Sequence, residues 1–322
     1  GTGIIRLEQN YRSTATILKA ANAVIANNSE RLGKNLWTAG SDGDPVQLYS
    51  AFNEQDEARF VVERIQHWVE QGNRRSEAAV LYRSNAQSRV FEERLIQAGV
   101  PYRVYGGLRF FERAEIKDAL AYLRLSAQRH DDASFERVVN QPPRGIGERT
   151  LDAVRQEARS RGQSLWQAAQ DLVRGAGLGA RARNALAAFL ELIEVHAQGL
   201  EGLTLGEQVE HMVAASSLRD HYGKEKGEKG QARVENLDEL VTAARQYEPE
   251  DGTGMAPLAD FLAHAALEAG EGQASEWEDC VQLMTLHSAK GLEFPLVFIA
   301  GMEDGLFPHQ RSIADPHGLE EE

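Results

Sequence analysis

Strand-like segments occur near both ends of this 322-residue chain, and a long helical stretch separates them. The segment 296–300, LVFIA, contains no polar residue, and strands of this kind are typical of parallel sheets buried on both faces. Another candidate strand covers 281–286. Toward the N-terminus, strand patterns alternate with helical patterns, which predicts a parallel sheet covered by helices. The N-terminal strand candidates are 4–7, 46–50, 78–82 and 101–105.

Residues 106–279 contain successive helical patterns and almost no strand signal. We therefore predict an α/β fold in which a parallel-sheet domain is split in sequence by a large all-helical insertion domain. The sheet domain comprises 1–105 and 280–322, and the insertion comprises 106–279. Two polar stretches of the insertion, 223–231 and 248–254, are predicted loops.

Polar residues beside the strand candidates predict helix ends. Ser13, Asn53 and Ser84 are predicted N-caps, because their side-chain oxygens can accept hydrogen bonds from the first amides of a helix. Gly99 is expected to end the third of these helices. The first helix is expected to carry its apolar residues on one face, namely Ile17, Leu18, Ala21, Val24 and Ile25.

The net charge of −14 argues against nucleic-acid binding over the whole surface. Contacts with a phosphate backbone must therefore come from local basic clusters. Taken alone, each cluster is better explained as a solvated helix face. The clusters are Arg103, Arg109, Arg113 and Lys117; Arg144 and Arg149; and Lys224, Lys226, Lys229 and Arg233.

The single cysteine, Cys280, excludes an internal disulfide framework and fits a reducing compartment. No apolar run is long enough to span a bilayer, and no export signal precedes the first strand candidate. Both ends of the chain read as cuts within a longer protein.

The stretch 7–13, LEQNYRS, lies where a predicted strand gives way to a helix. Ligands of parallel sheets bind outside the carboxyl ends of strands, so Tyr11 and Arg12 are candidate ligand contacts. Tyrosine can stack on a base, and arginine can form two hydrogen bonds with phosphate oxygens. A surface turn with an incidental salt bridge is the alternative.

A polar loop at 287–293 joins the last two strand candidates. Within it, Glu293 can accept hydrogen bonds from ribose hydroxyls, and His287 can meet a nucleic-acid backbone together with Thr285. Lys290 and Gly291 lie where α/β proteins often hold phosphates. The alternative is a tight connection in which Gly291 supplies a positive φ.

Gly145, Ile146 and Gly147 immediately precede an amphipathic helical pattern in the insertion, with Arg144 and Arg149 on either side. Two glycines let backbone amides approach a phosphate, and a helix N-terminus adds partial positive charge. This is a helix-hairpin-helix pattern, which contacts a duplex backbone without reading sequence. A glycine-hinged helix turn is equally compatible.

The phosphate-binding G-x-x-x-x-G-K-[ST] pattern is absent. The acidic pair in 56–59, DEAR, is predicted to lie in the first turn of a helix, where acids favour the helix dipole. It does not follow an apolar strand, so it is not a magnesium-binding pair. No metal-ligand spacing and no nucleophile–base pair is recognisable.

Several stretches together resemble the C-terminal half of superfamily one DNA helicases of the UvrD/Rep/PcrA type. They are LEQNYRS at 7–13, LYRSNAQSR at 81–89, YGGLRFFERAEIKDALAYLRL at 105–125 and LMTLHSAKGLEF at 283–294. The insertion stretches 225–240 and 264–273 are most similar to the helicase II branch of this family. The resemblance covers essentially the whole chain.

The resemblance implies two RecA-like motor domains with ATP between them, and movement 3′ to 5′ along single-stranded DNA. It identifies 1–105 and 280–322 as the second motor domain, 2A, and 106–279 as its helical insertion, 2B. Arg12 is implied to reach the γ-phosphate as a catalytic residue, while Tyr11 stacks on adenine. The implied nucleotide contacts are Gln9, Tyr11, Arg12, Lys290, Gly291 and Glu293. The implied DNA contacts are Arg83, Asn85, Arg109, Arg144, Gly145, Ile146, Gly147, Thr150, Thr285 and His287.

The chain departs from the family in lacking the first motor domain with its Walker A lysine and Walker B acids. The implied cofactors are ATP and Mg²⁺, with the metal held mainly by that missing domain, and no metal site is expected in this chain. The chain alone is therefore predicted to be inactive. The implied partners are single-stranded and double-stranded DNA and DNA-repair proteins, at the nucleoid in a bacterial cytoplasm, with no membrane.

Two other functions stay open. The chain could be a non-catalytic module that binds DNA or docks proteins. It could also be the motor part of a helicase–nuclease complex, although the helicase II-like insertion argues against that.

Overall fold

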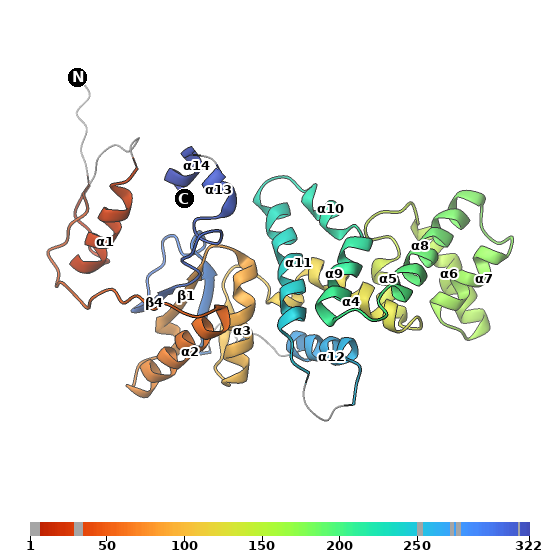
Figure 1. Cartoon of the computed structure of the whole chain (residues 1–322), viewed down its shortest axis with the longest axis horizontal. Coiled ribbons are helices and arrows are strands. Elements are labelled where there is room, and N and C mark those ends of the chain that lie inside the picture. The colour runs from red at the N-terminus through yellow and green to blue at the C-terminus, as the bar shows by residue number, and fades with distance from the viewer. Residues whose placement is uncertain (1–6, 29–34, 250–253, 271–273, 275–277, 315) are drawn as a thin grey trace, which may run out of the picture. The chain divides into compact units, whose positions relative to one another are not determined.

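The computed structural model describes residues 7–28, 35–249, 254–270, 274, 278–314 and 316–322. The chain divides into two compact units. Unit 1 comprises 1–106 and 274–322, and unit 2 comprises 107–273 (Figure 1). In the described residues, no helix is long and apolar enough to cross a membrane.

Unit 1 contains a four-stranded parallel sheet in the order β2-β3-β1-β4. Its strands are β1 (Ala78–Tyr82), β2 (Tyr102–Val104), β3 (Val281–Thr285) and β4 (Leu296–Ile299). The central strand β1 pairs with β3 on one side and with β4 on the other, so Ala79 lies opposite both Gln282 and Val297. The predicted parallel sheet built from both sequence flanks is therefore confirmed.

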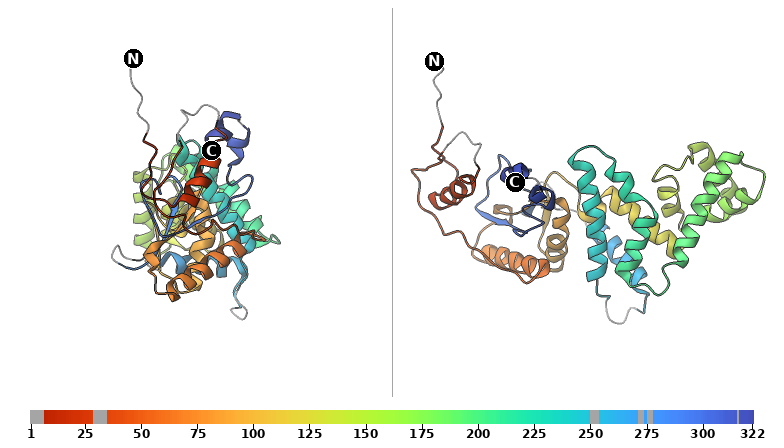
Figure 2. Two further views of the ribbon diagram at one scale, coloured as in Figure 1. Left: turned by 90° about the vertical axis from the view of Figure 1, so that its left-hand side faces the viewer. Right: turned by 45° about the horizontal axis from the view of Figure 1, so that its top comes forward.

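One face of this sheet is covered by α2 (Glu54–Glu70) and α3 (Ser88–Gln97), as Figures 1 and 2 show. Asn53 caps α2, as predicted, by accepting a hydrogen bond from the Asp56 amide at 2.9 Å. Ser84 caps the short 3-10 helix Asn85–Gln87, which runs directly into α3. Gly99 follows α3 with a φ of +64°, which is the left-handed conformation expected at a helix end.

The opposite face of the sheet is only partly covered. Ala79, Leu81 and Met284 are buried there by the loop between β3 and β4. On β4, however, Val297 is 44% exposed and Ile299 is 51% exposed. The prediction that 296–300 is buried on both faces is therefore wrong, because β4 lies at the edge of the sheet among the described strands and the loop covers the neighbouring strands instead.

The N-terminal part of unit 1 departs from two further predictions. Residues 46–50 form no strand, and Val46 and Leu48 are exposed, because an alternating pattern forms a strand only where a neighbouring strand accepts its hydrogen bonds. Helix α1 (Ala15–Ile25) begins after Thr14 rather than Ser13. Of its predicted apolar face, Leu18 is buried, whereas Ile17, Val24 and Ile25 are exposed. The predicted strand 4–7 lies outside the described residues apart from Leu7.

The remaining elements of unit 1 are short. They are the 3-10 helix Arg75–Glu77, α13 (Gln310–Ala314) and α14 (Pro316–Glu321).

Unit 2 is helical throughout its described residues (Figure 2). One continuous apolar core, centred on the buried helix α4, joins its helices. The predicted loop at 223–231 is shorter than expected, because residues 228–231 already belong to α11. The helices are α4 (Ala114–Ala127), α5 (Asp132–Val138), α6 (Glu148–Arg161), α7 (Leu165–Arg174), α8 (Ala180–Gln198), α9 (Leu205–Ala215), α10 (Leu218–Gly223), α11 (Glu228–Gln246) and α12 (Pro257–Gly270), preceded by the 3-10 helix Phe110–Glu112.

Candidate functional site

Two regions carry the predicted site residues, one in each unit. In unit 1 they lie in the N-terminal segment and at the carboxyl ends of β1 and β3, which are adjacent strands. Tyr82 at the end of β1 is in register with Thr285 at the end of β3, and the Leu286 amide donates to the Tyr82 carbonyl at 2.9 Å. The segments that contain Arg83, Asn85 and His287 therefore leave the sheet side by side.

The N-terminal motif meets the loop between β3 and β4. Arg12 Nε donates a hydrogen bond to Glu293 Oε2 at 2.9 Å, although the two residues are 281 positions apart in the chain. The Arg12 side chain is 51% exposed and that of Glu293 is 71% exposed. The fold thus unites two predicted nucleotide contacts at the surface, where an ion pair of this kind contributes about 0–1 kcal/mol and opens readily.

Asn10 holds the backbone turn from which the Arg12 side chain projects. Its Oδ1 accepts hydrogen bonds from the Arg12 amide at 2.9 Å and the Ser13 amide at 2.8 Å, which forms a tight side-chain-capped turn. Tyr11 projects from this turn with 85% of its surface exposed. Its hydroxyl donates to Gln9 Oε1 at 2.9 Å, and one face of its ring can still receive a flat ligand.

The loop between β3 and β4 is anchored on one side and open on the other. Leu286, Ala289 and Leu292 pack against the sheet, whereas His287, Lys290 and Gly291 are exposed. The Thr285 hydroxyl lies 3.0 Å from that of Ser288 and accepts from the Ser288 amide at 3.2 Å. Gly291 has a φ of +88°, so the turn itself requires glycine. This loop can present its polar side chains without losing its own packing.

Arg83 is held by a carboxylate. Its Nε and Nη2 donate to the two oxygens of Glu322 at 2.5 and 3.2 Å. The hydrogen bond from Arg83 is the main reason that the pKa of Glu322 lies below its usual value. Paired donation to two oxygens is also how arginine binds phosphate, so Glu322 shows the geometry that a DNA phosphate could adopt at Arg83.

Carboxylates in unit 1 do not form a metal centre in the described residues. The acidic pair Asp56 and Glu57 lies in the first turn of α2, as predicted. Asp56 accepts from the Tyr49 hydroxyl and the Phe52 amide, and Glu57 accepts from the Gly301 amide. Burial raises the pKa of Glu57. Within the described residues of either unit alone, no three metal-ligating side chains converge.

The glycine loop of unit 2, residues 145–147, lies directly before α6. Gly145 has a φ of +79°, and Gly147 is the N-cap residue of α6 in an ordinary extended conformation. Ile146 between them is buried, and so is Thr150. In the described part of the chain, no acceptor contacts the amides of Gly145, Gly147, Glu148 and Arg149, so four donors cluster at one surface.

The neighbouring space is open at both glycines. A Cβ atom added to Gly145 or Gly147 would meet no described atom within 4 Å. Packing of the protein therefore does not require glycine at Gly147. Close approach of a ligand to the backbone is another reason for a glycine at this position.

Two predicted DNA contacts face inward. Arg109 is only 4% exposed and donates to the Ala269 carbonyl at 3.0 Å and to Glu112. Arg144 donates to the Tyr122 hydroxyl at 2.5 Å and to the Pro142 carbonyl at 2.9 Å. Neither guanidinium is presented for DNA in this conformation, so the geometry does not favour these two assignments.

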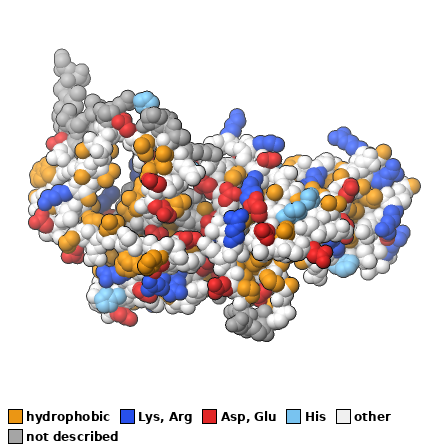
Figure 3. All heavy atoms as spheres, viewed as in Figure 1, with side chains coloured by type: hydrophobic (Ala, Val, Ile, Leu, Met, Phe, Trp, Pro, Cys, Tyr) orange, Lys and Arg blue, Asp and Glu red, His pale blue; other side chains and the backbone are white. Residues whose placement is uncertain are grey.

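Exposed arginines gather elsewhere in unit 2. Residues 144–183 contain eight arginines and four acidic residues, in a chain whose net charge is −14. Figure 3 shows basic side chains concentrated over α7 and the start of α8. Arg149, Arg174 and Arg181 are exposed, and none of the three forms an ion pair within the described ranges. The segment that carries this excess of positive charge begins at the glycine loop.

Sequence reasoning missed three residues that shape these regions: Asn10, Asn140 and Glu322. Asn10 precedes Arg12 by two positions, and this spacing is the signal of a side-chain-capped turn. Asn140 accepts from the Arg144 and Ile146 amides, four and six positions later, and this spacing was not recognised in the sequence. Glu322 reaches Arg83 across 239 positions, a contact that no local pattern reveals.

Comparison with known proteins identifies close relatives over the whole chain. Residues 5–322 match the UvrD-like helicase C-terminal domain family. The chain is 62% identical to DNA helicase II of Escherichia coli over 100% of its own length and 45% of that protein. It is 59% identical to DNA helicase II of Haemophilus influenzae over 99% of its own length and 44% of that protein. For the ATP-dependent DNA helicase PcrA of Bacillus subtilis the identity is 44%, over 99% and 44%. The chain thus spans less than half the length of these relatives.

Proposed function

Because the chain belongs to the UvrD-like helicase C-terminal domain family, we propose that it supplies the second motor domain and the duplex-binding insertion of an ATP-dependent DNA helicase. Unit 1 is the motor domain 2A, and unit 2 is the insertion 2B. The helicase moves 3′ to 5′ along single-stranded DNA. It works at bacterial chromosomal DNA, in repair and replication.

The contact between Arg12 and Glu293 carries the nucleotide half of this proposal. It joins the two parts of unit 1 that precede and follow the insertion, and it is weak enough for a nucleotide to open. Bound ATP brings the triphosphate whose γ-phosphoryl group is transferred to water. Arg12 then compensates the charge on that phosphate, while Glu293 accepts from the ribose and Tyr11 stacks on the base.

The residues of unit 1 fit one side of such a nucleotide. An exposed aromatic ring, an arginine and a carboxylate converge there, together with Gln9 and the exposed Lys290–Gly291 turn. The described residues of unit 1 offer neither a phosphate-binding glycine loop nor a cluster of metal ligands. Mg²⁺ and the rest of the phosphate contacts therefore belong to a first motor domain.

The DNA contacts fall in both units. Single-stranded DNA runs past the carboxyl ends of β1 and β3, against Arg83, Asn85, Thr285 and His287. Duplex DNA meets the four free amides at the glycine loop and the exposed Arg149. Amides and arginines bind phosphate without reading bases, which suits an enzyme that acts on any sequence.

Reconstitution tests this proposal. The chain alone should not hydrolyse ATP, because the phosphate cradle and the metal provide much of the stabilisation in phosphoryl transfer. Addition of the N-terminal half of a helicase II relative should restore ATP hydrolysis that depends on single-stranded DNA. Robust hydrolysis by the chain alone would contradict the half-site. Failure of every reconstitution, with both halves folded, would favour a non-catalytic binding module.

A further inference from the structure

We propose that Asn140 and Arg144 are positioning residues that hold the glycine loop with its amides outward, and that Arg144 is not itself a phosphate contact. This inference rests on the proposed duplex binding by the loop. It assigns a role to Asn140, which no sequence pattern indicated, and it gives Arg144 a different role from the one that the helix-hairpin-helix pattern suggested.

Asn140 supports the loop from beneath. Its Oδ1 accepts hydrogen bonds from the Arg144 amide at 2.8 Å and from the Ile146 amide at 3.2 Å. These amides alternate with those of Gly145 and Gly147, which have no acceptor within the described residues. One side-chain oxygen therefore gathers every second amide inward, and the intervening amides point away from it.

Arg144 closes the other side of the loop. Its guanidinium donates to the carbonyls of Val138, Pro142 and Ser216 and to the Tyr122 hydroxyl, and it lies over the rings of Tyr122 and Phe189. These groups come from α4, α5, α8, the end of α9 and the segment just before the loop. A guanidinium with this many partners is already satisfied, so it has little capacity left for a phosphate.

Tyr122 ties this arrangement to the start of the loop. Burial raises the pKa of Tyr122 to about 12, so its hydroxyl keeps its proton near neutral pH. The hydroxyl donates to the Gln141 carbonyl at 2.6 Å while its oxygen accepts from Arg144. Gln141 and Arg144, which both precede the glycine loop, thus share one buried hydroxyl.

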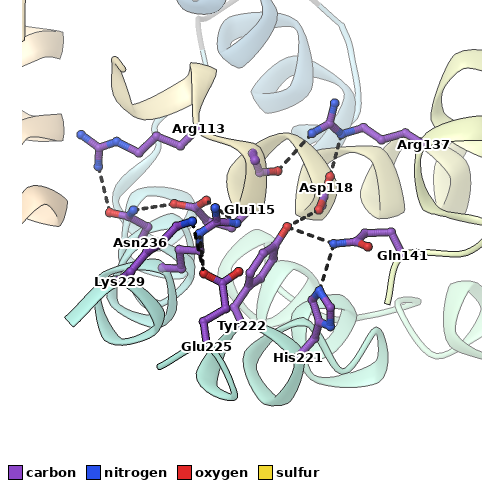
Figure 4. A network of polar contacts seen from close by, with 12 residues as sticks. Arg113, Glu115, Asp118, Arg137, Gln141, His221, Tyr222, Glu225, Lys229 and Asn236 are labelled. Atoms are coloured by element: carbon purple, nitrogen blue, oxygen red, sulfur yellow. Dashed lines mark hydrogen bonds and ion pairs between the residues drawn. The ribbon is translucent and has the colours of Figure 1, made fainter. Parts of the chain in front are cut away.

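A second layer of polar contacts holds Gln141 from the side of α10. Figure 4 shows its amide directed at both Tyr222 and His221, with Nε2 3.2 Å from the Tyr222 hydroxyl and 3.1 Å from His221 Nε2. The Tyr222 hydroxyl donates to Asp118 at 2.5 Å, and Arg137 pairs with Asp118 at 2.7 Å. Gln141, just before the glycine loop, is therefore held by a polar network of α4, α5 and α10.

A matched pair of substitutions tests the roles of the two arginines. Affinity of the chain for a fluorescent blunt DNA duplex is measured by anisotropy over a series of salt concentrations for Arg144→Met and Arg149→Met. Each lost phosphate contact should make the negative slope of log affinity against log salt shallower by about 0.9. We expect this reduction for Arg149→Met. Arg144→Met should instead lose affinity at every salt concentration, with an unchanged slope.

Asn140 is tested by truncation and by conservative replacement. Asn140→Ala should weaken duplex binding by about tenfold or more, because the loop amides lose the direction in which they donate to phosphate. The slope should not change, because no charge is lost. Asn140→Asp keeps an acceptor oxygen and should recover affinity relative to Asn140→Ala at salt concentrations that screen its charge. Hydrogen exchange of the Arg144 and Ile146 amides, without DNA, should be faster in Asn140→Ala than in the parent chain or in Asn140→Asp.

The outcomes separate this inference from the proposed function. A shallower salt dependence of duplex affinity in Arg144→Met would overturn the positioning roles. Unchanged hydrogen exchange of both amides in Asn140→Ala would do the same. Unchanged duplex binding in both Arg149→Met and Gly147→Ala would instead remove the duplex-binding function from the loop. If Asn140→Ala does not fold, hydrogen exchange of the same two amides is measured in Arg144→Met. It should be faster than in the parent chain, because loss of the guanidinium should also release the loop amides.

Discussion

The proposed nucleotide half-site of unit 1 and the glycine loop of unit 2 are built on opposite principles. Arg12, Tyr11 and Glu293 are exposed and meet through a single ion pair at the surface. The glycine loop rests on Asn140, Arg144 and Tyr122, which form hydrogen bonds within the protein. A site that a second domain completes can stay loosely held until that domain arrives. A loop that grips DNA with its backbone must be rigid beforehand, because ordering on binding reduces affinity.

The largest expected effect lies in the loosely held site. In the reconstituted enzyme, Arg12→Ala should lower kcat by about 10³- to 10⁵-fold, the range for arginines that act on a transferring phosphate in trans. Arg12→Lys should restore little, because an ammonium group lacks the planar pair of donors. The measurement is steady-state ATP hydrolysis at saturating single-stranded DNA. A near-normal kcat in Arg12→Ala would leave this residue with only its surface salt bridge.

The rigid site should respond to a single methyl group. Gly147→Ala places a Cβ where the protein has open space and where φ is −83°, so the midpoint of thermal unfolding should not change. Duplex affinity should fall by about tenfold or more, since hydrogen bonds from amides to phosphate contribute about 1.5–3 kcal/mol each. Gly145→Ala is the comparison, because its φ of +79° makes alanine destabilise the fold as well. Equal duplex affinity in the parent and Gly147→Ala would contradict close backbone approach.

Loss of the exposed ring should have an intermediate effect. Tyr11→Ala removes a stacking face, and base stacking on an aromatic side chain contributes about 1–3 kcal/mol. We expect the KM for ATP to rise while kcat changes little, which is the reverse of the pattern for Arg12→Ala. Tyr11→Phe serves as the control, since it keeps the ring and loses only the hydrogen bond to Gln9. A kcat defect without a KM defect would place Tyr11 outside the base-binding position.

The smallest effect should follow removal of the surface ion pair. Glu293→Gln keeps an acceptor for the ribose but loses the charge that holds Arg12. Exposed pairs contribute about 0–1 kcal/mol, so the KM for ATP should change by less than about tenfold. The effect should shrink further as salt is added. A large loss of kcat in Glu293→Gln would show that the half-site is more rigid than its exposure suggests.

Sequence patterns succeeded where the structure depends on local contacts. The strands around Val80 and Leu283, the cap at Asn53 and the turn at Gly291 follow from apolar runs, side-chain acceptors and positive φ. Strand 46–50 failed, since a strand also needs a neighbour, and the burial of Val297 failed, since it depends on what covers an edge.

The same limit applies to the candidate site. The motifs identified Arg12 and Glu293, but only the fold shows that they touch across 281 positions. Arg144 fits a phosphate-binding pattern in sequence, yet its partners include Tyr122 and Ser216, which are distant in the chain. A pattern of residue types shows which side chains are charged. The direction in which each one points depends on tertiary packing, which the pattern does not show.

The register of the sheet also has a consequence for synthesis on the ribosome. Ala79 pairs with Gln282 and Val297, so β1 is made about 200 residues before either neighbour. At about 5–20 residues per second, translation leaves β1 without its neighbours for about 10–40 s. The helices of unit 2 are complete within that interval and can fold first. The order of synthesis therefore favours folding of unit 2 before the sheet of unit 1 closes. A pause in translation before residue 281 would lengthen the time for which the apolar strand β1 stays unpaired.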